Sequence, residues 1–174
     1  MGQIVNVSES ERKYKLDFFQ KDSLWDREFI IYQWYDFVEK EKKTKLIIDL
    51  LNLTAKWVRV TKCRLNNSDS KKKIEYLSSD DIDLSKLVGS AFVCKRRSLK
   101  GKISIDTFYR SNNICKYLVE NEDNPSILES IPEFQDLVLR DVTEDTRFRN
   151  TNMTTTFTEV DKNNLLFLVQ LLKK

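Results

Sequence analysis

Residues 90–110 read SAFVCKRRSLKGKISIDTFYR, and this stretch decides the fold class. Two runs that alternate in polarity, Ser90–Leu99 and Lys102–Tyr109, are joined by Lys100-Gly101. A period of two is typical of a strand with one buried face, and a glycine between two such runs is typical of a tight turn. We therefore predict a β-hairpin here, with the core candidates Val93, Ile103 and Ile105.

A second hairpin is predicted upstream of the first. Lys56–Leu65 (KWVRVTKCRL) alternates, Asn66–Ser70 is a polar turn, and Lys72–Leu77 forms the returning strand. Lys45–Leu51 is predicted as a further strand. The middle of the chain is thus expected to be β-structure that curls into a compact barrel.

Helices are predicted on either side of these strands. The first is Ser23–Lys43, which begins with a capping serine and is rich in aromatic residues. Pro125 opens the second helix, Ser126–Val142. Asp161 caps the last helix, Asn163–Lys174, whose end carries two lysines. The sequence therefore predicts an α+β chain that is mainly β.

Composition argues against several classes of enzyme. The 174-residue chain has no histidine, which excludes Ser-His-Asp and Cys-His catalysis and His-ligated metals. Its three cysteines form no C-x-x-C pair, and three glycines are too few for a phosphate-binding loop. Acidic pairs such as Asp80-Asp81 lie in polar stretches, as solvated residues do. We expect a non-catalytic binding module with no cofactor and no metal.

Basic and aromatic residues gather on the two predicted hairpins. Lys56–Leu65 contributes four cations around Trp57, and the stretch from Ser90 to Arg110 contributes six more with Phe108 and Tyr109. Cations bind phosphates and aromatic faces stack on bases, which is how single-stranded nucleic acid is held. The alternative, left open by the residues alone, is a solvated basic face whose aromatic rings belong to the core.

The predicted tail helix is apolar almost all round. Seven of the eight residues at positions 165–172 are apolar, more than one face can bury against a single domain. Such a helix indicates a partner helix or groove. The alternative is a helix that sinks into a crevice of its own fold.

In chain order, these pieces resemble a known arrangement. A helix at Leu24–Val38 precedes KWVRVTKCRL, KKKIEYL, LVG at 87–89 and KGKISIDTFYRS, and NPSIL then opens a helix. This order resembles the N-terminal OB-fold of the middle-sized subunit of the telomere-capping CST complex, and is similar to the middle subunit of replication protein A. Two departures are visible: the glycine of the first strand is replaced around Lys62–Cys63, and no third strand is evident between Leu77 and Leu87.

The resemblance implies a single OB-type domain over residues 1–174 with a five-stranded barrel. Residues 1–22 would be an extension, 23–43 the pre-barrel helix, 45–142 the barrel with its following helix, and 161–174 a partner-binding helix. It further implies a nuclear, telomere-associated, single-stranded-DNA-binding subunit that supports capping and C-strand synthesis. The expected partners are a small single-OB subunit, a large OB subunit, telomeric DNA, and telomerase or polymerase α–primase.

The resemblance also assigns residues to these roles. Nucleic-acid binding would fall on Trp57, Arg59, Lys62, Lys95, Arg97, Lys102 and Tyr109, and partner binding on Leu165, Leu168, Val169 and Leu172. The competing hypothesis is an α+β scaffold for protein–protein interaction with no nucleic-acid role.

Overall fold

The structure, a computed structural model, describes residues 2–8, 12–16, 25–36, 42–64, 69–121 and 140–173. Its strands are β1 (Gly2–Ser8), β2 (Arg12–Leu16), β3 (Arg27–Tyr35), β4 (Lys42–Asp49), β5 (Thr54–Arg64), β6 (Asp69–Leu77), β7 (Ala91–Lys100), β8 (Ile103–Arg110), β9 (Tyr117–Asn121), β10 (Arg140–Asp141) and β11 (Thr155–Thr156). Its helices are α1 (Leu84–Leu87) and α3 (Glu159–Leu172), with short 3-10 turns at Ser79–Asp81, Thr146–Phe148 and Asn150–Asn152.

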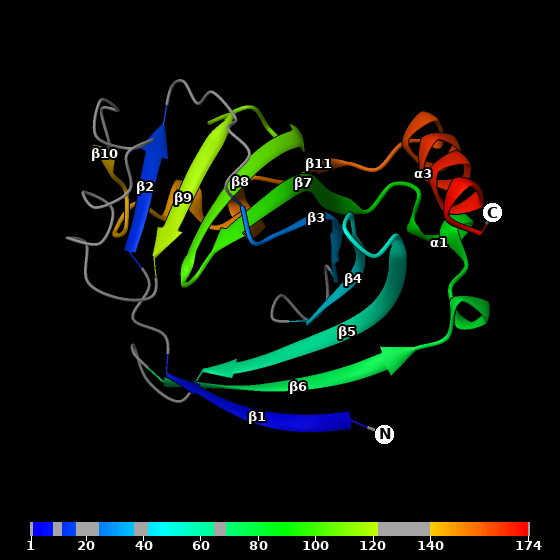
Figure 1. Cartoon of the computed structure of the whole chain (residues 1–174), viewed down its shortest axis with the longest axis horizontal. Helices are drawn as coiled ribbons and strands as arrows, with labels where there is room; N and C mark the ends of the chain where they lie inside the picture. Colours follow the sequence, from blue (N-terminus) through cyan, green and yellow to red (C-terminus); the bar gives the residue numbers. More distant parts are fainter. Residues whose placement is uncertain are drawn as a thin grey trace.

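One antiparallel sheet organises the chain. Its ten-strand order is β1-β6-β5-β4-β3-β7-β8-β9-β2-β10, and β11 pairs with β7 off this path. The sheet bends strongly, so that β5, β6 and β1 lie across from β2, β9 and β8 and enclose a concave inner side (Figure 1). Within the described ranges no pairing joins β1 to β10, and the sheet is not closed. The mainly β, α+β class is confirmed, whereas the five-stranded OB barrel is wrong.

Strand β3 replaces the first predicted helix. Its residues are buried or half-buried from Glu28 to Tyr35, on both faces of the sheet. A strand covered on both sides is apolar without clear alternation, and such a run resembles a buried helix. β3 pairs with β4 on one side and with β7 on the other, so it is a central strand. The helix predicted over Ser126–Val142 lies outside the described residues, apart from its end, which includes β10.

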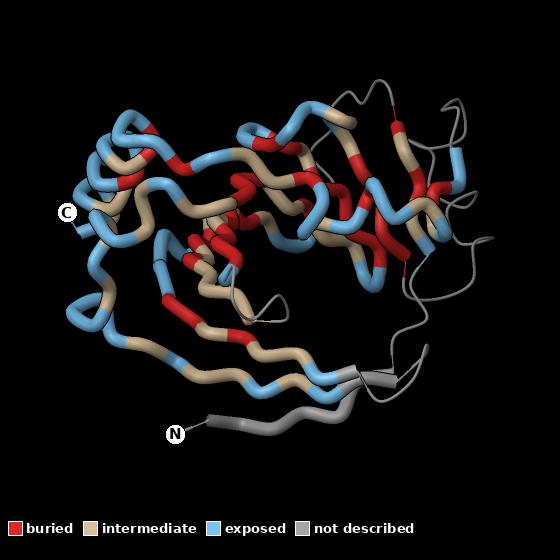
Figure 2. Tube along the Cα trace, turned by 180° about the vertical axis from the view of Figure 1, so that it is seen from behind, coloured by how far each residue is buried: buried red, intermediate tan, exposed pale blue. Residues whose placement is uncertain are grey.

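The outer face of the sheet carries the main aromatic cluster. Trp34 stacks on Trp57 with ring centroids 5.6 Å apart, and Phe157 meets Trp34 edge-on at 5.3 Å. Phe92 and Leu46, both fully buried, complete the centre of this cluster. Figure 2 shows buried residues concentrated along the strands beside this cluster, whereas the described part of β6 is only half-buried or exposed. Burial of these large rings supplies much of the hydrophobic stabilisation of the fold.

Helix α3 packs on this outer cluster. Leu165 is fully buried, and Leu168, Val169 and Leu172 contact the same cluster. The four residues assigned to partner binding therefore lie against the chain's own core. The exposed apolar side chains of α3 are others: Val160, Leu166, Phe167 and Leu171. No helix in the described parts of the chain is long and apolar enough to cross a membrane.

The N-terminus of α3 is tied to β8 by a charged contact. Thr158, not Asp161, is the N-cap, and Asp161 completes a capping box three residues later. Arg110 donates to both carboxylate oxygens of Asp161, at 2.9 and 3.2 Å. Burial opposes ionisation of Asp161, but hydrogen bonds from Thr158 and Arg110 hold its pKa below the usual range.

A β-bulge makes this contact possible. Cys94 lies opposite Arg110, while the next residue, Lys95, lies opposite Phe108, so Tyr109 is the extra residue of β8. An extra residue reverses the facing of the side chains that follow it. Phe108 therefore lies on the side of Lys95, and Arg110 reaches the outer face, where its guanidinium lies 5.9 Å from the Phe92 ring centroid.

We predict that Leu165→Ala lowers the free energy of unfolding by about 2–5 kcal/mol, because it leaves a cavity in the outer cluster. The matched control, Leu166→Ala on the exposed side of α3, should change it by less than about 0.5 kcal/mol. Urea denaturation measures both values. Equally small effects would show that α3 is not packed on its own sheet.

Candidate functional site

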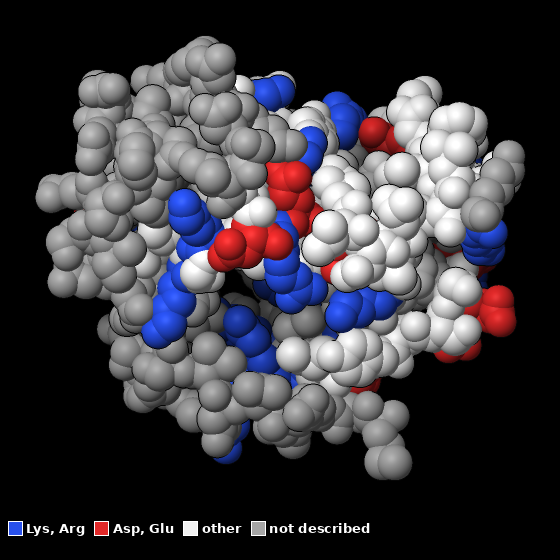
Figure 3. Space-filling model, viewed as in Figure 1, with Lys and Arg blue, Asp and Glu red and all other residues white. Residues whose placement is uncertain are grey.

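The inner face of the sheet carries charged side chains where the outer face carries aromatic rings. On β7, Lys95 and Arg97 alternate with Cys94 of the outer cluster, so they face inward. Lys45 of β4 lies opposite Gln33 of β3 and alternates with outer residues in the same way. The space-filling view shows Lys and Arg side chains, with some Asp and Glu, gathered around a hollow at the centre of the molecule (Figure 3).

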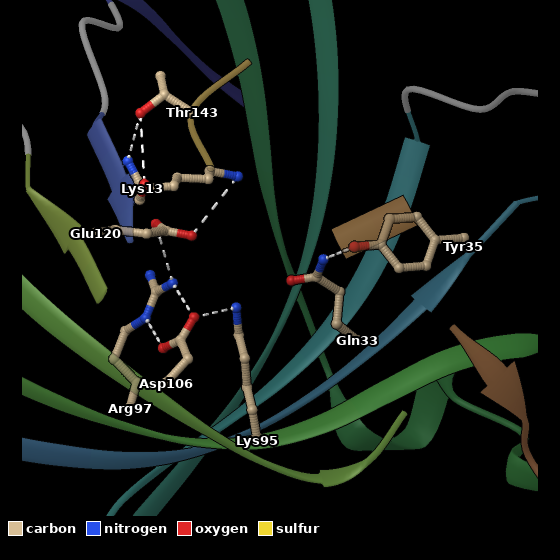
Figure 4. A network of polar contacts seen from close by, with 8 residues as sticks. All are labelled: Lys13, Gln33, Tyr35, Lys95, Arg97, Asp106, Glu120 and Thr143. Atoms are coloured by element: carbon tan, nitrogen blue, oxygen red, sulfur yellow. Dashed lines mark hydrogen bonds and ion pairs between the residues drawn. The ribbon is translucent and has the colours of Figure 1, made fainter. Parts of the chain in front are cut away.

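Asp106 of β8 is the centre of a buried ion network. Its carboxylate has no exposure to water and accepts from Lys95 Nζ at 2.7 Å and from Arg97 Nε and Nη2 at 2.7 and 2.8 Å. Burial opposes ionisation of Asp106, but the two cations outweigh it and hold the pKa of the carboxyl far below its usual value. In Figure 4 the three side chains converge from adjacent strands. This network fixes the positions of Lys95 and Arg97.

Glu120 of β9 extends the network towards β2. Its carboxylate lies 3.5 Å from Arg97 Nη2 and 3.8 Å from Lys13 Nζ, both longer than a good charged hydrogen bond. Lys13 is itself positioned through its backbone, because its N–H donates to Thr143 Oγ1 at 3.0 Å. Figure 4 shows Glu120 between Lys13 and Arg97. The long contacts leave the Glu120 carboxylate able to accept a closer partner.

Lys45 lies among other cations. Burial, followed by the positive charges of Lys43, Lys95, Arg97 and Lys72, lowers the pKa of its ammonium group well below the usual value. Unlike Asp106, which is surrounded by compensating charge, Lys45 is repelled by its neighbours. A cation in such a position is stabilised by an incoming anion. The low pKa of Lys45 is thus a physical sign of an anion-binding site.

Among the described residues, the inner face carries more positive than negative charge. The cations that form or adjoin the cluster are Lys13, Lys43, Lys45, Lys72, Lys95 and Arg97, and the carboxylates are Asp106 and Glu120. Asp106 is fully engaged by its two partners. A concave surface of this kind focuses a positive potential and attracts a compact polyanion.

A metal site made by the protein alone is not evident. In the described ranges, no group of three or more His, Cys, Asp or Glu side chains lies close enough to hold a metal ion. Mg²⁺ is commonly held by one or two carboxylates together with substrate phosphates. Glu120 is the inner carboxylate whose geometry fits this role, because its present contacts are long.

The structure brings together only part of the predicted nucleic-acid site. Lys95 and Arg97 both lie in the inner cluster. Trp57 is buried in the outer cluster, and Arg59 lies near Glu75, at 4.0 Å. Lys62 is half-buried on β5 and lies opposite Lys72 at the edge of the same cluster. Two others lie elsewhere: Lys102 is in the β7–β8 turn, and Tyr109 is exposed at the bulge.

Sequence reasoning missed six residues of the inner cluster: Lys13, Lys43, Lys45, Lys72, Asp106 and Glu120. They lie on five strands, β2, β4, β6, β8 and β9, and only the pairing of distant strands unites them. A weak signal was present, because Lys43 and Lys45 recur at a spacing of two, as Lys95 and Arg97 do. Charges repeated on the inner side of successive strands indicate a polar interior rather than a solvated face.

Comparisons with known proteins give a likeness in structure only. Neither the models of protein families nor the curated proteins include a match to the sequence. The crystal structure of the inorganic triphosphatase NE1496 superimposes with a TM-score of 0.51 and 15% identity, covering 84% of this chain and 93% of that one. A second structure, described as the hypothetical protein NE1496, superimposes with a TM-score of 0.49 and 15% identity, and the match covers 83% of this chain and 96% of that one. At this identity the first match shows a shared fold.

This likeness corrects the resemblance to the CST and replication protein A subunits. The chain has the fold of an inorganic triphosphatase, so a telomeric single-stranded-DNA-binding function and the associated OB-fold, telomerase and polymerase partners are not supported. The expectation of a non-catalytic module is overturned by the same finding, because the protein that shares the fold is an enzyme. A lack of histidine does not by itself exclude an enzyme, since phosphoryl transfer depends on positioning and charge rather than on a histidine base.

We predict that Asp106→Asn lowers the free energy of unfolding by about 3–5 kcal/mol at neutral pH, because Lys95 is then buried without its counter-ion. The folded-state pKa of Asp106 is lowered, so its contribution is present above the unfolded pKa of about 4 and fades as the pH falls below it. The difference in free energy of unfolding between Asp106→Asn and wild type should therefore become smaller in acid. Chemical denaturation at a series of pH values measures these free energies. Asp80→Asn, at an exposed position, is the control and should show no such pH-dependent difference.

We also predict that Lys45→Met stabilises the ligand-free protein. The folded-state pKa of Lys45 is lowered, so charging this group opposes folding at all pH values below its folded pKa. The penalty disappears as the pH approaches the unfolded value of about 10.4. The melting temperature of the variant should exceed that of wild type near neutrality and converge with it in base. Lys71→Met, at an exposed position of β6, should show no such trend, and a destabilised Lys45→Met would contradict the interpretation.

Proposed function

We propose that the chain binds inorganic triphosphate, or a closely related short polyphosphate, on the inner face of its sheet and hydrolyses it. The observation that carries the proposal is the cluster of cations on the inner face, where burial and then the positive charges of Lys43, Lys95, Arg97 and Lys72 lower the pKa of Lys45. The name of the fold neighbour, an inorganic triphosphatase, suggests the compound that would supply the missing negative charge.

The inner cluster suits the charge of such a substrate. A linear triphosphate carries negative charge along its whole length, so it needs cations at several points rather than one strong site. Lys45 and its neighbour Lys43 come from β4, Lys95 and Arg97 from β7, and Lys13 from β2. Cations presented from separate strands can contact successive phosphoryl groups. Arg97, held in place by Asp106, offers a rigid planar donor, whereas the lysines act as adjustable point charges.

The proposed reaction requires little covalent chemistry from the protein. A water oxygen attacks the terminal phosphorus, the bond from that phosphorus to the bridging oxygen breaks, and phosphate and pyrophosphate leave. Catalysis of this kind comes from alignment and from stabilisation of the charge that develops on the phosphoryl oxygens. Inner cations already fixed by Asp106 provide that stabilisation without further rearrangement.

Glu120 is the residue proposed to handle the attacking water. It is buried at the inner face, and its contacts of 3.5 and 3.8 Å leave capacity for a shorter hydrogen bond. The carboxylate can accept the proton that the water loses, or hold the Mg²⁺ that accompanies the substrate. Asp106 is unsuited to either role because its oxygens are occupied by Lys95 and Arg97.

The test is release of phosphate from tripolyphosphate by the purified chain, with and without Mg²⁺ or Mn²⁺. We expect Lys45→Met and Glu120→Gln each to lower kcat/KM by about 10²–10³-fold, the effect typical of removing one positioned polar group. Lys71→Met, on β6 at an exposed position, should retain wild-type activity. No turnover in any metal condition, together with no calorimetric binding of tripolyphosphate, would refute the proposed function.

A further inference from the structure

The outward side of helix α3 exposes large apolar side chains. Val160 is 66% exposed, Phe167 is 64% exposed and Leu171 is 51% exposed. In both views the helix lies at the periphery of the molecule, with its other side against the outer aromatic cluster (Figures 1 and 2). Large apolar side chains gathered on the surface of a folded chain usually mark an interaction site.

These three side chains form one stripe along the helix, which we call the outward stripe. Successive residues of an α-helix are rotated by about 100°, so positions 160, 167 and 171 fall within about 40° of one another. Leu165, which is fully buried in the outer cluster, lies roughly on the opposite side of the helix. Helix α3 therefore has two apolar faces, and only one of them packs on its own sheet.

The order of residues along the outward stripe fits a second copy of the same helix. A two-fold axis midway between positions 160 and 171 places Val160 of each copy against Leu171 of the other, so the two apolar ends cover each other. The same axis brings Phe167 of each copy close to the centre of the contact, beside Asn164 of the other copy. Phenylalanine is one of the residues enriched at protein interfaces.

Charge selects the antiparallel direction for this pair. The helix begins at the exposed Glu159 and ends at the exposed Lys173, and both lie on the same side of the outward stripe. Equal sides meet in an antiparallel pair, so each Glu159 lies near Lys173 of the other copy, and the helix dipoles oppose each other favourably. A parallel pair would instead gather both glutamates at one end and both lysines at the other.

The existing contact of Glu159 leaves room for this second partner. Its carboxylate lies 2.8 Å from Lys162 Nζ one turn along the helix, but the Glu159 side chain remains largely exposed. A carboxylate has two oxygens and can accept from two cations. The charge pattern of α3 is therefore complementary to its own reverse.

From these observations we propose that the outward stripe of α3 docks a second copy of this chain, in a two-fold dimer whose two helices run antiparallel. A contact of one helix from each copy is smaller than the standard interface of about 800 Å² per partner, so the dimer should dissociate on dilution. Helix α3 lies on the outer face of the sheet and the cationic cluster on the inner face. The dimer therefore does not depend on the function proposed for the inner face.

The test is sedimentation velocity of the full chain over a wide range of concentrations. We expect a reversible equilibrium between monomer and dimer, and Phe167→Asp should abolish the dimer because it places a charge near the axis from each copy. The matched control is Leu166→Asp, which is also exposed but is rotated by about 100° from Phe167, and it should change Kd by less than about threefold. Monomer alone at every concentration, or an equal loss of dimer in both variants, would overturn the proposal.

A charge exchange tests the direction of the two helices. Glu159→Lys should weaken the dimer about tenfold, since attraction is replaced by repulsion at both ends of the contact. Adding Lys173→Glu to the same chain reverses both charges and should restore most of the affinity. A double variant as weak as Glu159→Lys alone would contradict the antiparallel arrangement.

Two further measurements separate this proposal from other readings. A chain that stays monomeric but sediments with vesicles of phosphatidylcholine and phosphatidylglycerol would show that a lipid surface, rather than a second copy, covers the stripe. Phosphate release from tripolyphosphate by Phe167→Asp should equal that of wild type. Because dimerisation and phosphate release are read independently, failure of one proposal is distinguishable from failure of the other.

Discussion

A fully buried carboxylate, Asp106, determines how the interior of this protein is arranged. Sealed from water, it is ionised only because Lys95 and Arg97 bind it from the neighbouring strand. The same contacts orient Arg97 towards Glu120, and through Glu120 the network reaches Lys13 on β2, the strand next to β9. Strands β7, β8, β9 and β2 are thus linked by charged side chains as well as by their backbone hydrogen bonds.

The two faces of the sheet have different roles. The outer face contains the stacked rings around Trp34 and the helix α3, and this packing stabilises the chain. The inner face contains Lys45 among like charges, which opposes folding. A protein can retain such an unfavourable cluster when a ligand needs it and the rest of the core compensates. The aromatic cluster on one side is therefore what permits the cationic cluster on the other.

Local sequence pattern predicted the hairpins well and the site only in part. The runs Ser90–Leu99 and Lys102–Tyr109 became β7 and β8 with ends shifted by one residue. Arg27–Tyr35 was assigned to a helix because burial on both faces removes the alternation that marks a strand. Lys95 and Arg97 were named as nucleic-acid-binding residues through the resemblance to the CST subunit, and the structure places both in the inner cluster. Their partners from distant strands, Asp106 and Glu120 among them, were missed, since nothing local shows which strands will pair.

The bulge at Tyr109 has a consequence for how this chain can vary. Upstream of it, β8 directs Asp106 to the interior; downstream of it, Arg110 holds the helix on the exterior. The presence of Tyr109 as an additional residue sets this arrangement, and its side chain also hydrogen-bonds Arg96. Deleting it would turn Arg110 inward, add a cation to an already repulsive cavity and release the helix. The number of residues in this strand is therefore as much a part of the fold as their chemistry.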